Sequence, residues 1–194
     1  MTKLFARIPK DRIAVLIGPN GSCREHIEKK LSVNLEINSE TGDVEISLPD
    51  GVSDPSVFFA ARDIVLAIGR GFSPSRAFRL LEDEETAFEI IDLREVFGKS
   101  NSNIRRVNGR IIGRDGKTRR LIEETSEASV SVYGHTVAII GNPEQLEIAR
   151  QAINLLIKGS PHSTVYKYLE KQRREMKKKK LTLWEDSSLS VREK

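Results

Sequence analysis

The sequence predicts an α+β protein in which one structural unit occurs twice and is followed by a basic helix. The pattern Ile-Gly-x-x-Gly stands at residues 17–21 and again at residues 112–116, and each copy has an isoleucine nine residues after its first glycine. Apolar residues with helical or alternating spacing surround both copies in the same order. A third segment, residues 167–180, holds eight Lys or Arg and two Glu, for a net charge of +6.

The composition limits the classes of protein to consider. The chain has 194 residues, of which 38% are apolar and 31% charged, so it has enough aliphatic side chains for a compact core. Its apolar runs are only a few residues long, and its first residues carry charge where a secretory signal is apolar. We therefore expect a cytoplasmic protein without a membrane span. The single cysteine, Cys23, excludes an internal disulfide.

The first unit is expected to run strand, helix, glycine loop, helix, strand, strand, helix. The helix after the loop is indicated by Ile27 and Leu31, which lie four residues apart on one face. The last helix is expected to begin with Asp54 as N-cap and Pro55 at its first position. The strands are expected at residues 4–8, 33–37 and 44–48, and the helices before residue 18, at residues 23–31 and from residue 54 to the glycines at 69 and 71.

The second unit repeats this order. Asn142 and Pro143 are expected to cap and begin its last helix, whose apolar residues recur every three to four positions. The two units therefore predict two three-stranded antiparallel sheets, each covered on one face by three helices. The strands of the second unit are expected at residues 88–93, 128–132 and 137–140, and its helices before residue 113, at residues 117–125 and from residue 143.

A Gly-x-x-Gly between two helices permits close contact with a phosphodiester. Glycine allows the backbone to turn sharply, and the missing Cβ atoms let a phosphate approach. The helix that follows directs its unsatisfied N–H groups and its positive dipole end at that phosphate. Apolar side chains beside the loop can form a groove for unpaired bases.

The motif, the isoleucine nine residues on and the order of elements resemble the KH domain. This resemblance implies that each unit holds about four single-stranded nucleotides against its glycine loop. Only 17 residues precede Gly18, enough for one strand and one short helix, which favours the type I arrangement. We expect a first KH domain at residues 1–71, a linker with a short helix at 72–86, a second KH domain at 87–159, and a basic helix with a flexible tail at 160–194. The two domains are expected to act as tethered sites.

The charges differ between the two glycine loops. The second loop lies in a segment with seven Lys or Arg and one acidic residue, so we expect it to attract phosphate more strongly and to lose affinity as salt rises. The residues expected to contact RNA are Gly18, Pro19, Asn20, Gly21 and Arg24 in the first copy, and Arg110, Gly113, Arg114, Asp115, Gly116, Lys117 and Arg120 in the second.

Catalytic and metal-dependent functions find no support in the sequence. Gly116-Lys117-Thr118 resembles the end of a nucleotide-binding P-loop, but the position that requires its first glycine holds Ile111. Cys23 and His26 lie three apart on a helix, but two ligands make no metal site. We therefore expect no enzyme, no cofactor and no metal.

The basic C-terminal segment allows three interpretations: a solvated helix face, a contact with rRNA phosphates, or a contact with a protein. Tyr166, Tyr168 and Leu169 at its start suggest that this helix packs on the second domain. Beyond it, residues 181–194 are polar apart from Leu183 and Trp184, and Trp184 is a candidate docking anchor.

Over residues 3–180 the chain resembles the archaeal relatives of a ribosome assembly factor, the partner of the Nob endonuclease. The resemblance rests on two KH units, the second motif Gly-Arg-Asp-Gly-Lys-Thr, and the basic helix after them. It implies binding of single-stranded RNA at the 3′ end of the small-subunit rRNA, near a Nob-type endonuclease, and contact with the alpha subunit of translation initiation factor two. In eukaryotic relatives the first KH domain usually lacks the Gly-x-x-Gly, whereas Gly18 and Gly21 are both present here.

Two other functions remain open at this point. One is a KH-type regulator of mRNA or small RNA, which would not prefer the rRNA 3′ end over unrelated RNA. The other is an RNA-binding subunit associated with the exosome, which would copurify with that machine.

Overall fold

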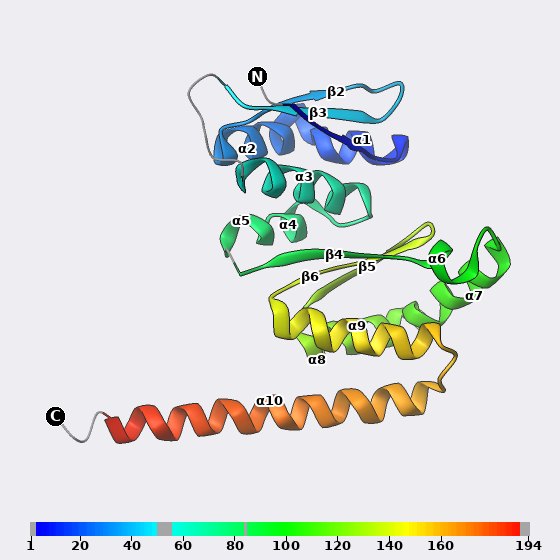
Figure 1. The fold of residues 1–194 in the computed structure, drawn as a ribbon, viewed down its shortest axis with the longest axis vertical. Coiled ribbons are helices and arrows are strands. Elements are labelled where there is room, and N and C mark those ends of the chain that lie inside the picture. The colour runs from blue at the N-terminus through cyan, green and yellow to red at the C-terminus, as the bar shows by residue number, and fades with distance from the viewer. Residues whose placement is uncertain (1–2, 50–55, 84, 191–194) are drawn as a thin grey trace.

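The elements of the protein stack in layers along its longest axis (Figure 1). The computed structural model describes residues 3–49, 56–83 and 85–190, with side chains up to residue 179. The expected N-cap Asp54 and the following Pro55 lie outside the described residues. From one end to the other, the layers are a sheet, its helices, a second sheet, its helices, and one long helix.

The N-terminal unit has the predicted order of elements. Its sheet has the strand order β1-β3-β2, and both pairs of neighbours are antiparallel. Alternation along the strands places Leu35, Val44 and Ile46 in the core, where each is 1% exposed or less. The elements are β1 (Lys3–Arg7), α1 (Lys10–Ile17), the 3₁₀ turn Pro19–Gly21, α2 (Ser22–Leu31), β2 (Asn34–Ile37), β3 (Asp43–Ser47) and α3 (Ser56–Gly69).

The C-terminal unit has the same topology, with the antiparallel strand order β4-β6-β5. It contains one short helix that was not predicted, α6. This helix forms because the Asp92 side chain accepts a hydrogen bond from the Arg94 N–H at 2.8 Å and so caps its first turn. Its elements are β4 (Ala87–Asp92), α6 (Leu93–Phe97), α7 (Asn101–Ile112), the 3₁₀ turn Arg114–Gly116, α8 (Lys117–Ser126), β5 (Ser129–Tyr133), β6 (Thr136–Gly141) and α9 (Pro143–Ile157).

The two units are packed together, and the segment between them is part of the contact. Two short helices, α4 (Pro74–Ala77) and α5 (Arg79–Glu82), lie between α3 and the second sheet (Figure 1). Ala138 and Ile140 of β6, both 0% exposed, belong to the same apolar cluster as the core of the N-terminal unit. The second sheet therefore uses its outer face to bury apolar surface against the first unit, so the units do not hang on a free linker. Joint binding by the two sites stays a prediction.

Polar bonds surround this contact between the units. Arg79 Nη1 donates to Ser129 Oγ at 2.8 Å, and Ser131 Oγ donates to the Arg70 carbonyl at 2.8 Å. The Tyr133 hydroxyl donates to the carboxylate of Asp11 on α1. These bonds join α1, α5 and the residue after α3 to strand β5. Directional hydrogen bonds therefore fix the relative position of the units together with apolar burial.

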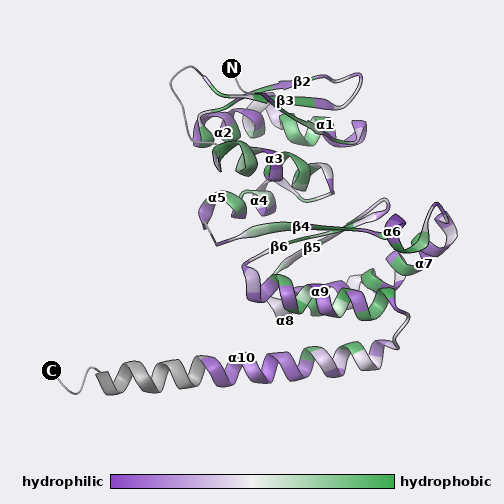
Figure 2. Cartoon of the chain, viewed as in Figure 1, coloured by the Kyte–Doolittle hydropathy of each residue, from purple (hydrophilic) through white to green (hydrophobic). Residues whose placement is uncertain are grey.

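A long helix after the second unit forms a further layer. Helix α10 (His162–Ser190) packs on α8 and α9, with Val165 0% and Leu169 1% exposed. Its middle is strongly hydrophilic after a more apolar start (Figure 2). Helical backbone continues to Ser190. Within the described part of the chain, no helix is long and apolar enough to cross a membrane.

Candidate nucleic-acid interface

The two glycine loops have nearly the same backbone conformation. Gly18 and Gly113 share a φ of 73°, with ψ of 174° and 176°. Asn20 and Asp115 are left-handed, with φ, ψ of 51°, 29° and 52°, 28°. Asn and Asp tolerate this conformation better than other non-glycine residues, so both variable sequences suit the same turn.

The two glycines of each loop face different surroundings. A Cβ atom on Gly113 would lie 2.3 Å from Thr118 Oγ1 and 2.8 Å from the Thr118 amide nitrogen, and one on Gly18 would lie 2.7 Å from Cys23 Cβ. A Cβ on Gly116 would have no neighbour within 4 Å. The first glycine is therefore required by packing, and the second leaves a backbone flank that a phosphate can approach.

The helices that follow the loops begin without a side-chain cap. Gly21 precedes α2 and Gly116 precedes α8, and neither helix start has a capping side-chain hydrogen bond. The first N–H groups of each helix are thus available to an outside acceptor. Together with the positive end of the helix dipole, they favour binding of an anion beside each loop.

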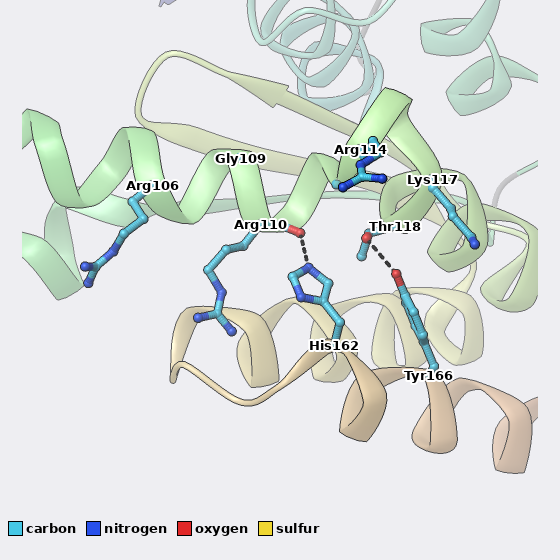
Figure 3. A pocket seen from close by; sticks show the side chains of 9 residues that line it. Arg106, Gly109, Arg110, Arg114, Lys117, Thr118, His162 and Tyr166 are labelled. Atoms are coloured by element: carbon cyan, nitrogen blue, oxygen red, sulfur yellow. Dashed lines mark hydrogen bonds between the residues drawn. The ribbon is translucent and has the colours of Figure 1, made fainter.

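Cations gather at the second loop around a cavity of about 350 Å³ (Figure 3). Arg114 and Lys117 extend from the loop and from the start of α8, and Arg106 and Arg110 from α7. Arg106, Arg114 and Lys117 are exposed, and within the described residues they have no ion pair and no hydrogen bond. The cavity is lined by Arg106, Gly109, Arg110, Gly113, Arg114, Lys117, Thr118, His162 and Tyr166.

Two predicted contact residues, Arg110 and Arg120, make hydrogen bonds to backbone carbonyls. Arg120 Nη2 donates to the Asp115 carbonyl at 2.7 Å, and Arg110 Nη2 donates to the Ser160 carbonyl at 2.5 Å. Arg120 therefore holds the loop in shape, and Arg110 joins α7 to the segment before α10. These bonds compensate neither positive charge, because both partners are neutral carbonyls.

The first loop carries less positive charge. Arg24, its nearest basic residue, is paired with Glu28 at 3.1 Å on the same helix. Pro19 and Asn20 are exposed and neutral. Cys23 is buried behind the loop, and burial raises the pKa of its thiol to about 11, so this side chain stays neutral and packs as an apolar group.

Five residues that line the second site were not among the predicted contacts: Arg106, Gly109, Thr118, His162 and Tyr166. His162 Nε2 donates to the Arg110 carbonyl at 3.0 Å, and the hydroxyls of Thr118 and Tyr166 share a hydrogen bond of 3.1 Å (Figure 3). His162 and Tyr166 are four residues apart and so lie on one face of α10. That spacing was the available signal, but the partner surface of α10 cannot be seen in the sequence.

A matched pair of glutamates was also missed. Glu28 Oε1 accepts from the Leu35 N–H at 2.9 Å, and Glu123 Oε1 accepts from the Val130 N–H at 2.9 Å. Each bond attaches the helix after a glycine loop to the neighbouring edge strand. Both glutamates follow the isoleucine of the repeat by one position, so extending the repeat alignment would have found them.

Among the described residues, no group of three or more His, Cys, Asp and Glu side chains is placed to hold a metal ion. His26 instead packs its ring against Phe78, with 4.5 Å between the ring centres.

The antiparallel three-stranded sheet, the uncapped helix after a Gly-x-x-Gly and the surrounding cations define a KH-type nucleic-acid-binding module. The model for the second KH domain of PNO1, a eukaryotic type KH-domain (KH-domain type I), matches residues 87–174. A KH domain-containing protein of Methanocaldococcus jannaschii is 47% identical over 182 residues, covering 94% of this chain and 79% of that protein. The chain belongs to the KH-domain family of archaeal Dim2p and PNO1-like proteins.

The names of two further relatives refer to rRNA or to its processing. Dim2p in a crystal structure described as an a/eIF2alpha-aDim2p-rRNA complex from Pyrococcus horikoshii is 55% identical, with a TM-score of 0.82, and the match covers 90% of this chain and 95% of that chain. The pre-rRNA-processing protein PNO1 of Coccidioides immitis is 32% identical over 142 residues. This chain aligns with 73% of its own length but with only 54% of that eukaryotic protein.

Proposed function

We propose that this protein is a non-catalytic, cytoplasmic RNA-binding factor of small ribosomal subunit assembly, which binds single-stranded RNA at the 3′ end of the small-subunit rRNA through its two glycine loops. The observation that carries the proposal is the open backbone flank of Gly116 beside uncompensated cations. The names of relatives, a pre-rRNA-processing protein and a component of an rRNA complex, support the rRNA as target.

The proposal assigns the chain two tandem type I KH domains, at residues 1–71 and 87–159, with the linker at 72–86 and the basic segment at 160–194. The equal backbone angles of the two loops support an RNA-binding role for the first domain as well as the second. The contact residues are those predicted from the sequence, of which Arg120 also supports the loop and Arg110 also bonds the segment before α10. The proposed partners are a Nob-type endonuclease and the alpha subunit of translation initiation factor two, the latter supported by the complex of the Pyrococcus relative.

A fluorescence titration tests this function. The full chain and its Gly21→Asp and Gly116→Asp variants are titrated with short single-stranded RNA matching the rRNA 3′ end, with scrambled and duplex RNA as controls. We expect selective binding to the 3′-end RNA, a large loss in Gly116→Asp because a carboxylate then occupies the phosphate position, and a smaller loss in Gly21→Asp.

Two results would contradict the proposal. Unchanged affinity in Gly116→Asp would remove the second glycine loop from the binding site. Equal affinity for 3′-end and scrambled RNA would instead favour a general RNA-binding regulator.

A further inference from the structure

The cavity beside the second glycine loop is closed on one side by α10. Its other walls are the C-terminal end of α7 and the start of α8, and His162 and Tyr166 come from the first two turns of α10 (Figure 3). The family model that matches this region also extends to residue 174, well into α10. The start of α10 is thus structurally part of the second KH unit.

The α10 wall is held in a defined position. His162 bonds to the carbonyl of Arg110 and Tyr166 to the hydroxyl of Thr118, so one turn of α10 is attached to each side of the glycine loop. Arg110 bonds to the Ser160 carbonyl just before α10. A cavity built in this way is formed before a ligand arrives, which reduces the ordering cost of binding.

The charge in this cavity is one-sided. Four of its lining residues are cationic, and none of the lining residues is acidic. Arg106, Arg114 and Lys117 have no ion-pair partner among the residues that the structure describes, and Arg110 bonds only to a neutral carbonyl. Close cations without counter-charges repel each other, and an anion in the cavity would relieve that repulsion.

The first glycine loop lacks these features. Cys23 occupies the position of Thr118, so it has no hydroxyl to bind a further helix, and Arg24 is already paired with Glu28. Within the described residues, the cavity is therefore a feature of the second unit alone, whereas the geometry of the glycine loop is common to both units.

We infer that the cavity between the second glycine loop and α10 binds a second backbone phosphate of the RNA strand, adjacent to the phosphate at the open flank of Gly116. The inference rests on the proposed function and adds α10 to the RNA-binding surface. Arg106 and Arg110 contact this second phosphate from α7, and His162 and Tyr166 position the wall behind it.

Adjacent arginines on α7 provide a matched test. Arg106 lines the cavity, whereas Arg105 does not, and both are exposed and without ion pairs among the described residues. RNA affinity of the full chain is measured against salt concentration for Arg106→Gln and Arg105→Gln. Loss of one phosphate contact flattens the slope of log affinity against log salt by about 0.7 for single strands. We expect this change in Arg106→Gln and little change in Arg105→Gln; equal changes in both would overturn the inference.

A neutral variant tests the cavity without changing its charge. A Cβ on Gly109 would meet no atom within 4 Å, and leucine is a better helix former than glycine, so Gly109→Leu fills the cavity while α7 keeps its stability. We expect weaker RNA binding with an unchanged or raised urea midpoint. Unchanged RNA binding by this variant would show that the cavity is not used.

An RNA series with single neutral methylphosphonate linkages then locates the phosphate. In the unmodified protein, two adjacent linkages should weaken binding, and Arg106→Gln should remove the effect of one of them. If the protein binds no single-stranded RNA, the proposed function fails. If Gly116→Asp abolishes binding but only one linkage matters, the function stands and the second phosphate site is wrong.

Discussion

Gly113 and Gly116 are three residues apart in one loop, yet a side chain at each position would meet different obstacles. Gly113 has φ 73° and ψ 176°, a region essentially limited to glycine, and its missing Cβ makes room for Thr118. Gly116 has φ 75° and ψ 12°, and the space beside it is open. A substitution at Gly113 should therefore mainly lower the stability of the fold, and one at Gly116 should mainly weaken RNA binding.

Alanine substitutions test this separation. Gly113→Ala should lower the free energy of unfolding by about 3–5 kcal/mol, from backbone strain and overlap with Thr118. Gly116→Ala should lower it by only about 1 kcal/mol but weaken RNA binding roughly tenfold, because its methyl group occupies the phosphate approach. Urea unfolding and RNA titration of both variants check the prediction, and a reversed order of the two stability losses would contradict it.

His135 provides a pH prediction. Burial lowers the pKa of its imidazole below 6.5, and Arg94 and Arg70 lower it further, against the opposing effect of Asp92 at 3.8 Å. As pH falls through the pKa that His135 has in the unfolded chain, the unfolded chain binds more protons than the folded one. The contribution of His135 to stability is therefore present above that pKa and is lost at lower pH.

We therefore expect His135→Gln to reduce the loss of stability between about pH 7 and pH 5. Urea unfolding across this range measures the effect. Arg94→Gln removes one cause of the lowered pKa and should reduce the loss partly; an unchanged pH profile in His135→Gln would show that this residue does not contribute.

At the scale of elements, the N-termini of helices differ in their capping hydrogen bonds. Asn142 accepts from the Gln145 N–H at 2.9 Å, as expected of an N-cap, and the Gln145 side chain accepts from the Asn142 N–H at 3.1 Å, which completes a capping box at the start of α9. Ser100 stands at the same position of α7 but makes no side-chain cap bond.

Asn142→Ala should thus lower the free energy of unfolding by about 1 kcal/mol. The matched control, Ser100→Ala, should change it little. Thermal unfolding of both variants distinguishes them, and similar losses would mean that the capping box adds nothing beyond helix propensity.

Elements that depend on a local sequence pattern were predictable from the sequence. Features that depend on contacts between residues distant in the sequence were not. The strands and the helix starts depend on alternation, on Asn142 and on the glycines, all visible in the sequence. Helix α6 was missed because a single cap at Asp92 forms it in a segment without clear periodicity. The cations of the second site were predictable from charge, but the α10 wall required the distant pair Thr118 and Tyr166 to meet.

At the scale of the whole molecule, the two faces of strand β6 serve different cores. Ile139 and Ile140 are both 0% exposed, but Ile139 packs in the C-terminal unit and Ile140 in the cluster shared with the N-terminal unit. Neighbouring residues of one strand point to opposite faces of its sheet. The two units should therefore respond together to changes at Ile140.

Hydrogen exchange tests this coupling. Ile140→Ala should destabilise the protein by about 2–5 kcal/mol and lower amide protection in α3 as well as in the second sheet. Ile139→Ala, the matched control, should lower protection mainly in the C-terminal unit. Unchanged protection of α3 in Ile140→Ala would mean that the units open independently.

The course of α10 also bears on how quickly RNA is captured. Lys167, Arg173 and Lys177 continue the positive charge along α10 from the second glycine loop and have no ion pair or hydrogen bond within the described residues. From His162 to Lys177 the helix rises about 22 Å, more than twice the screening distance of about 8 Å at physiological salt. A strand that first meets any part of this line stays close to the protein while it moves toward the loop. We therefore expect the charges of α10 to raise the association rate constant for RNA, and the loop with its cavity to govern the dissociation rate constant.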